Sequence, residues 1–193
     1  MRPVWTRQHG ITLLLTLLLL LGVLILGATA ANMALVGERA ARADRDRHLA
    51  FQAAEEAVMD AERDIEGKAG PAARQAAFAG TAPDAFAPDC GSADLAGLCA
   101  SPDGMAPAWQ RVDIADGAAS AAHGQFTGAA METGQGALPL RRPRYIVERL
   151  RYRQPGAAAD EEAGYYYRVT VVGFGAREGT EVVLQTAYRK TDE

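Results

Sequence analysis

Histidine and cysteine are scarce in this chain, and the usual motifs of catalytic and nucleotide-binding sites are missing. Only three histidines and two cysteines occur among 193 residues. The sequence has no H-E-x-x-H zinc motif, no G-x-S-x-G nucleophile motif and no P-loop. Gly173-Phe174-Gly175 is interpreted as a turn, because no helix clearly follows it to hold a phosphate. We therefore expect no enzyme, no cofactor and no metal.

Basic residues are too few and too dispersed for a nucleic-acid-binding surface. The chain has 20 Lys and Arg against 24 Asp and Glu, a net charge of -4. Arg2 and Arg7 fall within the first ten residues, so the rest of the chain is more acidic still. Because nucleic-acid recognition needs a basic face, the charge pattern predicts no nucleic-acid partner.

Between Gln8 and Gly37 there is no charged side chain. Residues 11–36 are mostly Leu, Ile, Val, Ala and Gly. As a helix they span about 39 Å, which exceeds the hydrocarbon core of a bilayer, about 30 Å. Arg2 and Arg7 precede this segment and favour a cytoplasmic N-terminus. The sequence predicts a single-pass inner-membrane protein whose C-terminal domain lies in the periplasm.

Three kinds of N-terminal segment share this pattern. Ala28-Thr29-Ala30 is an A-x-A site, typical of a secretory signal peptide that is removed on export. A second hypothesis is a signal anchor that is never cut. In a third, a peptidase cuts between Gly10 and Ile11 and the apolar helix stays in the mature protein. Glycine suits such a site because it places no side chain beside the extended scissile bond.

The helical pattern continues beyond the apolar segment. No proline occurs between Pro3 and Pro71, and residues 37–66 are polar but helix-prone. Apolar side chains recur there at spacings of three and four, at Phe51, Ala54, Val58, Ala61 and Ile65. We therefore predict one helix over residues 11–66, with a transmembrane half (11–36) and an amphipathic half (37–66).

Three motifs in this helix match a known family. Glu38-Arg39, Arg45-Asp46-Arg47 and the run L-A-F-Q-A-A-E from Leu49 resemble the N-terminal pattern E-R-x-A, R-D-R-x-L-A-F-Q-A-A-E of PilX-type minor pilins. Residues 1–10 resemble a prepilin leader. The C-terminal segments 167–170 and 182–188 also resemble the end of PilX-type proteins.

This resemblance implies a type IV pilin-like α+β fold and a structural role. A prepilin peptidase would cut between Gly10 and Ile11, and the new Ile11 amine would be N-methylated. The protein would lie in inner-membrane lipid before assembly, then prime assembly of a type IV pilus and end at or near its tip at the cell surface. Other minor pilins and a tip adhesin are the implied partners.

Leu15 stands where major pilins carry a glutamate, at the fifth mature position. In the family, that carboxylate neutralises the N-terminal amine of a neighbouring subunit, since an unpaired carboxylate in hydrocarbon is costly. A subunit with leucine has no carboxylate that must pair with the amine of a neighbouring subunit, which suits a position at the tip. The alternative is that Leu15 is one more membrane leucine of a plain anchor.

Residues 67–143 are predicted to form a loop-rich connector with one short helix near 71–78. They hold seven of the nine prolines and both cysteines. Cys90 and Cys99 follow the apolar segment, and an even number of cysteines in an exported chain predicts a disulfide. The alternative is a metal pair with His123. Trp109 is expected to anchor the core.

Residues 144–193 are predicted to form an antiparallel β-meander. Strands are expected at 144–152, 165–172 and 181–188, which are rich in β-branched and aromatic residues, with turns at 154–164 and 173–179. One face of the second strand is expected to cover the helical stripe with Tyr165, Tyr167, Val169 and Val171. The long helix would thus pack on a C-terminal antiparallel sheet.

Other functions remain open at this point. A tip pseudopilin of a type II secretion system shares the leader and the missing carboxylate. A secreted or membrane-anchored periplasmic binding module and a periplasmic enzyme with an unrecognised site are further alternatives.

Overall fold

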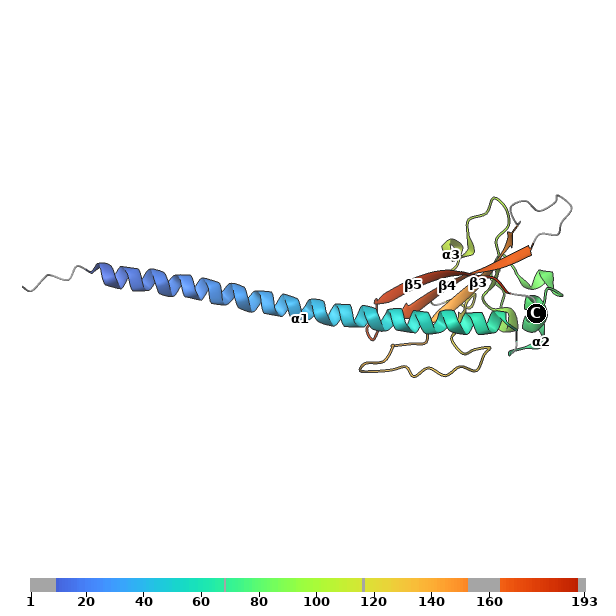
Figure 1. Cartoon of the computed structure of the whole chain (residues 1–193), viewed down its shortest axis with the longest axis horizontal. Coiled ribbons are helices and arrows are strands. Elements are labelled where there is room, and N and C mark those ends of the chain that lie inside the picture. Colours follow the sequence, from blue (N-terminus) through green and yellow to red (C-terminus); the bar gives the residue numbers. More distant parts are fainter. Residues whose placement is uncertain (1–9, 68, 116, 153–163, 191–193) are drawn as a thin grey trace, which may run out of the picture. The chain divides into compact units, whose positions relative to one another are not determined.

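The computed structural model describes residues 10–67, 69–115, 117–152 and 164–190, and has the predicted α+β architecture (Figure 1). The helices are α1 (Ile11–Ile65), α2 (Ala72–Phe78) and α3 (Ala108–Arg111), with 3-10 turns at Pro83–Ala85 and Ala93–Leu95. The strands are β1 (Leu98–Ala100), β2 (Ala121–Ala122), β3 (Arg144–Tyr152), β4 (Gly164–Phe174) and β5 (Glu181–Tyr188). The chain forms two compact units, with a boundary between Asp44 and Arg45. We call residues 11–44 the stem and residues 45–190 the head.

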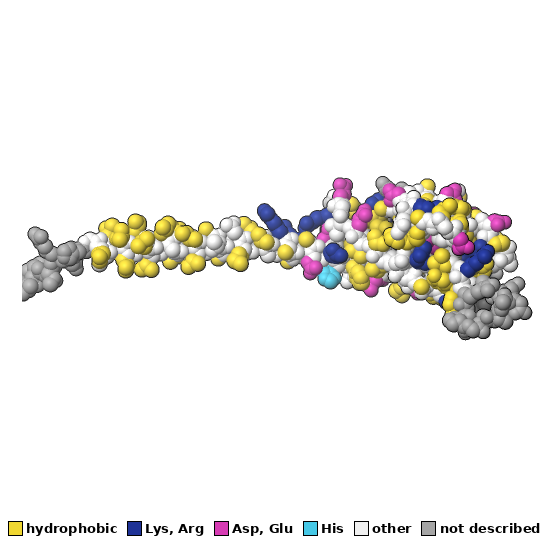
Figure 2. All heavy atoms as spheres, turned by 90° about the horizontal axis from the view of Figure 1, so that it is seen from above, with side chains coloured by type: hydrophobic (Ala, Val, Ile, Leu, Met, Phe, Trp, Pro, Cys, Tyr) yellow, Lys and Arg dark blue, Asp and Glu magenta, His cyan; other side chains and the backbone are white. Residues whose placement is uncertain are grey.

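Every side chain of the stem is exposed, and Figure 2 shows hydrophobic side chains over its visible surface. α1 is long and apolar enough to cross a membrane. Two of its threonine hydroxyls bond back to the helix itself, since Thr16 donates to the Leu13 carbonyl and Thr29 to the Ile25 and Leu26 carbonyls. This removes polar groups that hydrocarbon could not satisfy.

The sheet of the head is larger than the predicted meander. β3, β4 and β5 pair antiparallel as expected. β1 adds to β3 in parallel and β2 adds to it antiparallel, so the sheet is mixed. Both short strands come from the segment predicted as a loop-rich connector. Their three and two residues are too short to show a period of two in the sequence.

β4 also runs further than predicted. The expected turn beginning at Gly173 starts later, because Gly173 and Phe174 still pair with Val182 and Glu181 of β5. A side chain at Gly173 would overlap the Ala50 carbonyl of α1. The glycine therefore marks the closest approach of helix and sheet rather than a turn. Most of the other expected turn, 154–164, lies outside the described residues.

The core between α1 and the sheet contains part of the predicted stripe, since Ala54, Ala61 and Ile65 are buried and Val58 packs against them. The buried face consists of small residues at helical spacing, namely Ala50, Ala53, Ala54, Ala57 and Ala61, and ends at Ile65. Phe51 is 40% exposed, so its assignment to the core was wrong. Alanine allows the helix backbone to lie close to the sheet, where a phenylalanine ring would not fit.

From β4, Tyr167, Val169 and Val171 cover this helix face as predicted. Tyr165, which was expected beside them, is 43% exposed. It lies two residues before Tyr167, near the start of β4, where the strand is exposed.

The opposite face of the sheet is covered by the connector. Ile146, Val172 and Phe174 pack there against Cys90 and Cys99, together with Ala108 and Ile114. Trp109 is 40% exposed, so the prediction that it anchors the core was wrong. Its neighbour Ala108 is the buried residue of α3. A helix of one turn has only one side that can face the core, and Ala108 lies on that side.

Candidate functional site

The predicted processing site lies where α1 begins. Gly10 is an exposed turn residue, and Ile11 is the first residue of the helix. Among the described residues, no atom lies within 4 Å of a Cβ placed at Gly10. The preceding part of the predicted leader, residues 1–9, lies outside the described residues. Cleavage and methylation here stay predictions.

Leu15 lies on the exposed surface of the stem, 61% accessible. The first carboxylate of α1 is that of Glu38, which forms an ion pair with Arg42 one turn later. Residues 11–37 therefore offer a neighbouring subunit apolar and small polar side chains but no charge. The proposed meaning of Leu15 remains a prediction.

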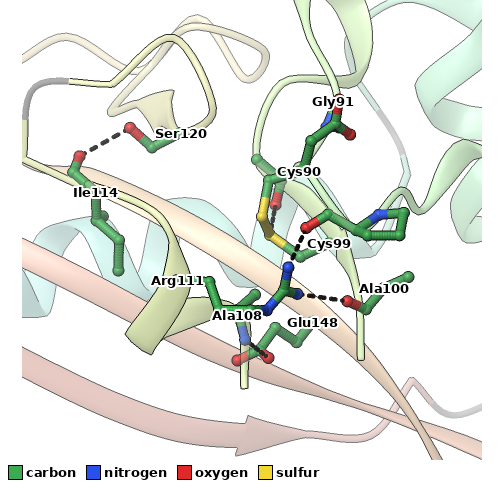
Figure 3. The surroundings of a disulfide bond; sticks show 12 residues. Cys90, Gly91, Cys99, Ala100, Ala108, Arg111, Ile114, Ser120 and Glu148 are labelled. Carbon is green, nitrogen blue, oxygen red and sulfur yellow. Dashed lines mark hydrogen bonds between the residues drawn. A yellow bond between two sulfur atoms is a disulfide. The ribbon is translucent and has the colours of Figure 1, made fainter. Parts of the chain in front are cut away.

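Cys90 and Cys99 form a disulfide, with Cα atoms 4.0 Å apart (Figure 3). Because both sulfur atoms are used in this bond, the alternative metal pair with His123 does not form. His123 is buried elsewhere, where its backbone N–H donates to the Pro143 carbonyl.

Arg111 ties together the chain on both sides of the disulfide (Figure 3). Its guanidinium donates to the carbonyls of Ala106 (2.8 Å), Pro88 (2.7 Å) and Ala100 (3.2 Å). One side chain thus supplies partners for three backbone acceptors in a region with little regular structure.

Replacing Cys99 with serine should destabilise the head by about 2–3 kcal/mol, because the disulfide no longer restricts the unfolded chain. Membrane insertion should be unchanged, since the stem is untouched. Limited proteolysis of the head in the full-length protein measures the effect, with Ser92→Ala in the same loop as the control. Equal protease resistance in the two variants would contradict this prediction.

Glu148 on β3 is a fully buried carboxylate on the connector side of the sheet. It accepts hydrogen bonds from the Ser101 hydroxyl (2.6 Å) and the Ala108 N–H (2.7 Å). Arg168 of β4 adds two more, both 2.8 Å long. Burial alone would raise the pKa of Glu148, but the bonds from Arg168, Ser101 and Ala108 outweigh it and lower that pKa.

The head should therefore lose stability in acid. A lowered folded-state pKa means that ionised Glu148 stabilises the head above its ordinary pKa of 4.5. This contribution disappears as the pH falls through the lowered value. Glu148→Gln should lower the free energy of unfolding of the head by about 2 kcal/mol at pH 7. It should also make that free energy depend less on pH below 4.5. Urea unfolding at pH 7, 5 and 3 measures this, and the exposed Glu178→Gln, which should leave the dependence unchanged, is the control.

A second buried charge cluster joins the end of α1 to α2. Arg74 donates to both carboxylate oxygens of Asp64, at 2.6 to 2.9 Å, and to the Ala96 carbonyl at 2.9 Å. The Tyr145 hydroxyl donates to the same carboxylate at 2.9 Å. Burial and the nearby charge of Asp64 raise the pKa of Tyr145 well above its ordinary value.

Two further aspartates of α1 hold loops of the head. Asp60 accepts hydrogen bonds from the Gly124 N–H (2.7 Å) and the Thr127 hydroxyl. Asp46 accepts one from the Ala176 N–H (2.6 Å) after β4. Burial opposes ionisation of Asp46, but the bonds from Thr180 and Ala176 more than offset it and lower its pKa.

Sequence reasoning missed these buried acids. The predicted stripe contains only apolar residues, whereas Asp46, Asp60 and Asp64 share the buried helix face with the alanines. The signal was their spacing, since residues 46, 50, 53, 57, 60 and 64 follow each other at intervals of three and four. Together these contacts let one helix hold the connector and the sheet, so these aspartates have a structural role in the head.

Two protein-family models match the chain. The model named PilX N-terminal matches residues 9–58. The model described as Type IV pilus assembly protein PilX C-term matches residues 95–190. They cover the stem, the buried helix face from Asp46 to Ala57 and the whole sheet. No curated protein and no solved structure matches the chain.

Proposed function

Because the chain belongs to the PilX-type family of type IV pilus assembly proteins, we propose that it is a minor pilin that primes assembly and lies at or near the filament tip. The stem would anchor the protein in the inner membrane, with the N-terminus in the cytoplasm and the head in the periplasm. Its role would be structural, with no reaction of its own. The observation that carries this proposal is the exposed apolar stem joined to a folded head in one uninterrupted helix.

An exposed apolar stem has two successive uses. In the membrane its leucine side chains face lipid. In a filament they would pack against the stems of other minor pilins, which removes the same surface from water after the subunit leaves the bilayer. A prepilin peptidase is the partner required first, since only cleavage after Gly10 frees the start of the stem. A tip adhesin would meet the head.

The mature N-terminus tests the proposal. Mass spectrometry of protein isolated from membranes and sheared filaments should find N-methylated Ile11 as the first residue. A chain beginning at Ala31 would show that the stem is removed on export, and no filament could then hold the head. A chain that keeps Met1 would mark a plain membrane anchor. Either result would overturn the assignment.

The proposed tip position depends on Leu15. Replacing it with glutamate supplies the carboxylate that pairs with a neighbour's N-terminal amine, so the subunit should enter the filament shaft more freely. Immunogold labelling should find several times more of this protein along filaments, by a factor of about five or more if one buried ion pair is gained. Leu17→Glu, two residues further along the stem, is the matched control. An unchanged distribution would count against the tip position.

A further inference from the structure

β5 forms an open edge of the sheet. It pairs with β4 on one side, and no described strand pairs with the other. None of its outward backbone groups has a backbone hydrogen bond within the described residues beyond the sheet ladder. Exposed edges are usually blunted by charge, proline, a bulge or shortness. Charged residues stand only at the two ends of β5, at Glu181 and just after it at Arg189. Residues 182–188 between them contain no charged residue, proline or glycine, so the middle of this edge has none of these protections.

A groove of about 840 Å³ lies between this edge and α1. The helix contributes Leu49, Ala53 and Met59, and β5 contributes Leu184. Met131 and Pro139 close it from the connector. Met59 is 51% exposed, which is costly for a large apolar side chain in an exported protein. The groove and the open edge are thus adjacent parts of one surface.

The unpaired backbone groups and the groove beside them suit a ligand in an extended conformation. A row of unpaired N–H and C=O groups is matched by another strand, whose side chains at every second position would enter the groove. Glu55 and Glu56 line the groove, so a basic residue in the occupant would be favoured. Pairing with β5 of a second copy would bring two sets of these glutamates together and is disfavoured by their repulsion.

We propose that β5 accepts a β-strand from a different protein, with apolar side chains at alternate positions and a lysine or arginine facing Glu55 and Glu56. The added strand would extend the sheet by one and fill the groove against α1. This inference rests on the head alone and does not depend on the fate of the N-terminus, so the two proposals can fail separately.

The test uses full-length protein in lipid nanodiscs and the peptide Lys-Val-Thr-Val-Thr-Val-Thr-Val-Lys. Residue-resolved hydrogen exchange should show every second amide of β5 slowed about fivefold or more, because only alternate N–H groups face the open edge. A peptide with proline at its central position should give no protection. Absence of alternate protection with the first peptide would overturn the proposal.

Two variants of α1 form a matched pair. Met59→Lys places a charge inside the groove and should abolish protection of β5. Phe51→Lys alters an equally prominent exposed residue that does not line the groove, and should leave protection intact. Unchanged exchange of β3 amides confirms that both variants fold. Equal binding of the peptide by both variants would overturn the proposal. So would slowed exchange at every second β5 amide in the absence of peptide, if it increased with protein concentration, because the occupant would then be a second copy of this chain.

Discussion

Replacing Gly173 with alanine should destabilise the head by about 3 kcal/mol, although it adds a single methyl group. The new Cβ would overlap the Ala50 carbonyl oxygen and lie 2.6 Å from the Ala54 nitrogen and 2.7 Å from the Ala54 Cβ. Most of these atoms belong to the backbone of α1 and cannot rotate away. The helix would have to move off the sheet, which opens the core along Ala54, Ala57 and Ala61.

Gly164 provides the control on the same strand. Among the described residues, a Cβ at Gly164 would meet the Tyr152 carbonyl oxygen alone, at 3.9 Å, so Gly164→Ala should change stability by less than about 0.5 kcal/mol. Urea unfolding of both variants, followed by circular dichroism, compares them with the parent chain. If Gly173→Ala unfolds at the same urea concentration as Gly164→Ala, the close contact between α1 and β4 does not exist in solution.

Local sequence patterns predicted the long elements of this fold. The charge-free segment and the absence of proline predicted α1 almost to its end, and β-branched runs located β3, β4 and β5. These signals are strong because they repeat over many residues. The position of the helix face was predicted less well, since large side chains such as Phe51 were assumed to be buried. The decisive residues were alanines, which carry little hydrophobicity but permit close approach.

Contacts between distant segments could not be predicted in the same way. The even number of cysteines indicated a disulfide, because cysteine chemistry has few alternatives in a chain that is expected to be exported. Glu148 and Arg168 each resemble ordinary surface residues of a strand. Only their pairing across β3 and β4 explains why both lie where they do. The exposure of Trp109 could not be predicted either. Its helix has a single turn, so the sequence offers no repeating pattern that would indicate which side is buried.

Replacing Arg74 with methionine should destabilise the head by about 3–5 kcal/mol, because Asp64 would remain buried without its counter-ion. Arg74 has 0% exposure, and its guanidinium lies 3.8 Å from the centre of the Phe126 ring. Methionine keeps most of that packing, so the loss would come from the charge. Adding Asp64→Leu should recover at least half of the loss, since a buried ion pair replaced by apolar residues costs little.

Urea unfolding of the two single variants and the double variant completes a double-mutant cycle. Arg63→Met is the control, because this exposed arginine precedes Asp64 on α1 and its removal should cost less than about 0.5 kcal/mol. If the double variant is as unstable as Arg74→Met alone, the unpaired carboxylate is not the cause. Recovery would mean that the cost of Arg74→Met comes from the carboxylate left buried without a partner, and that apolar packing alone can hold α2 against α1.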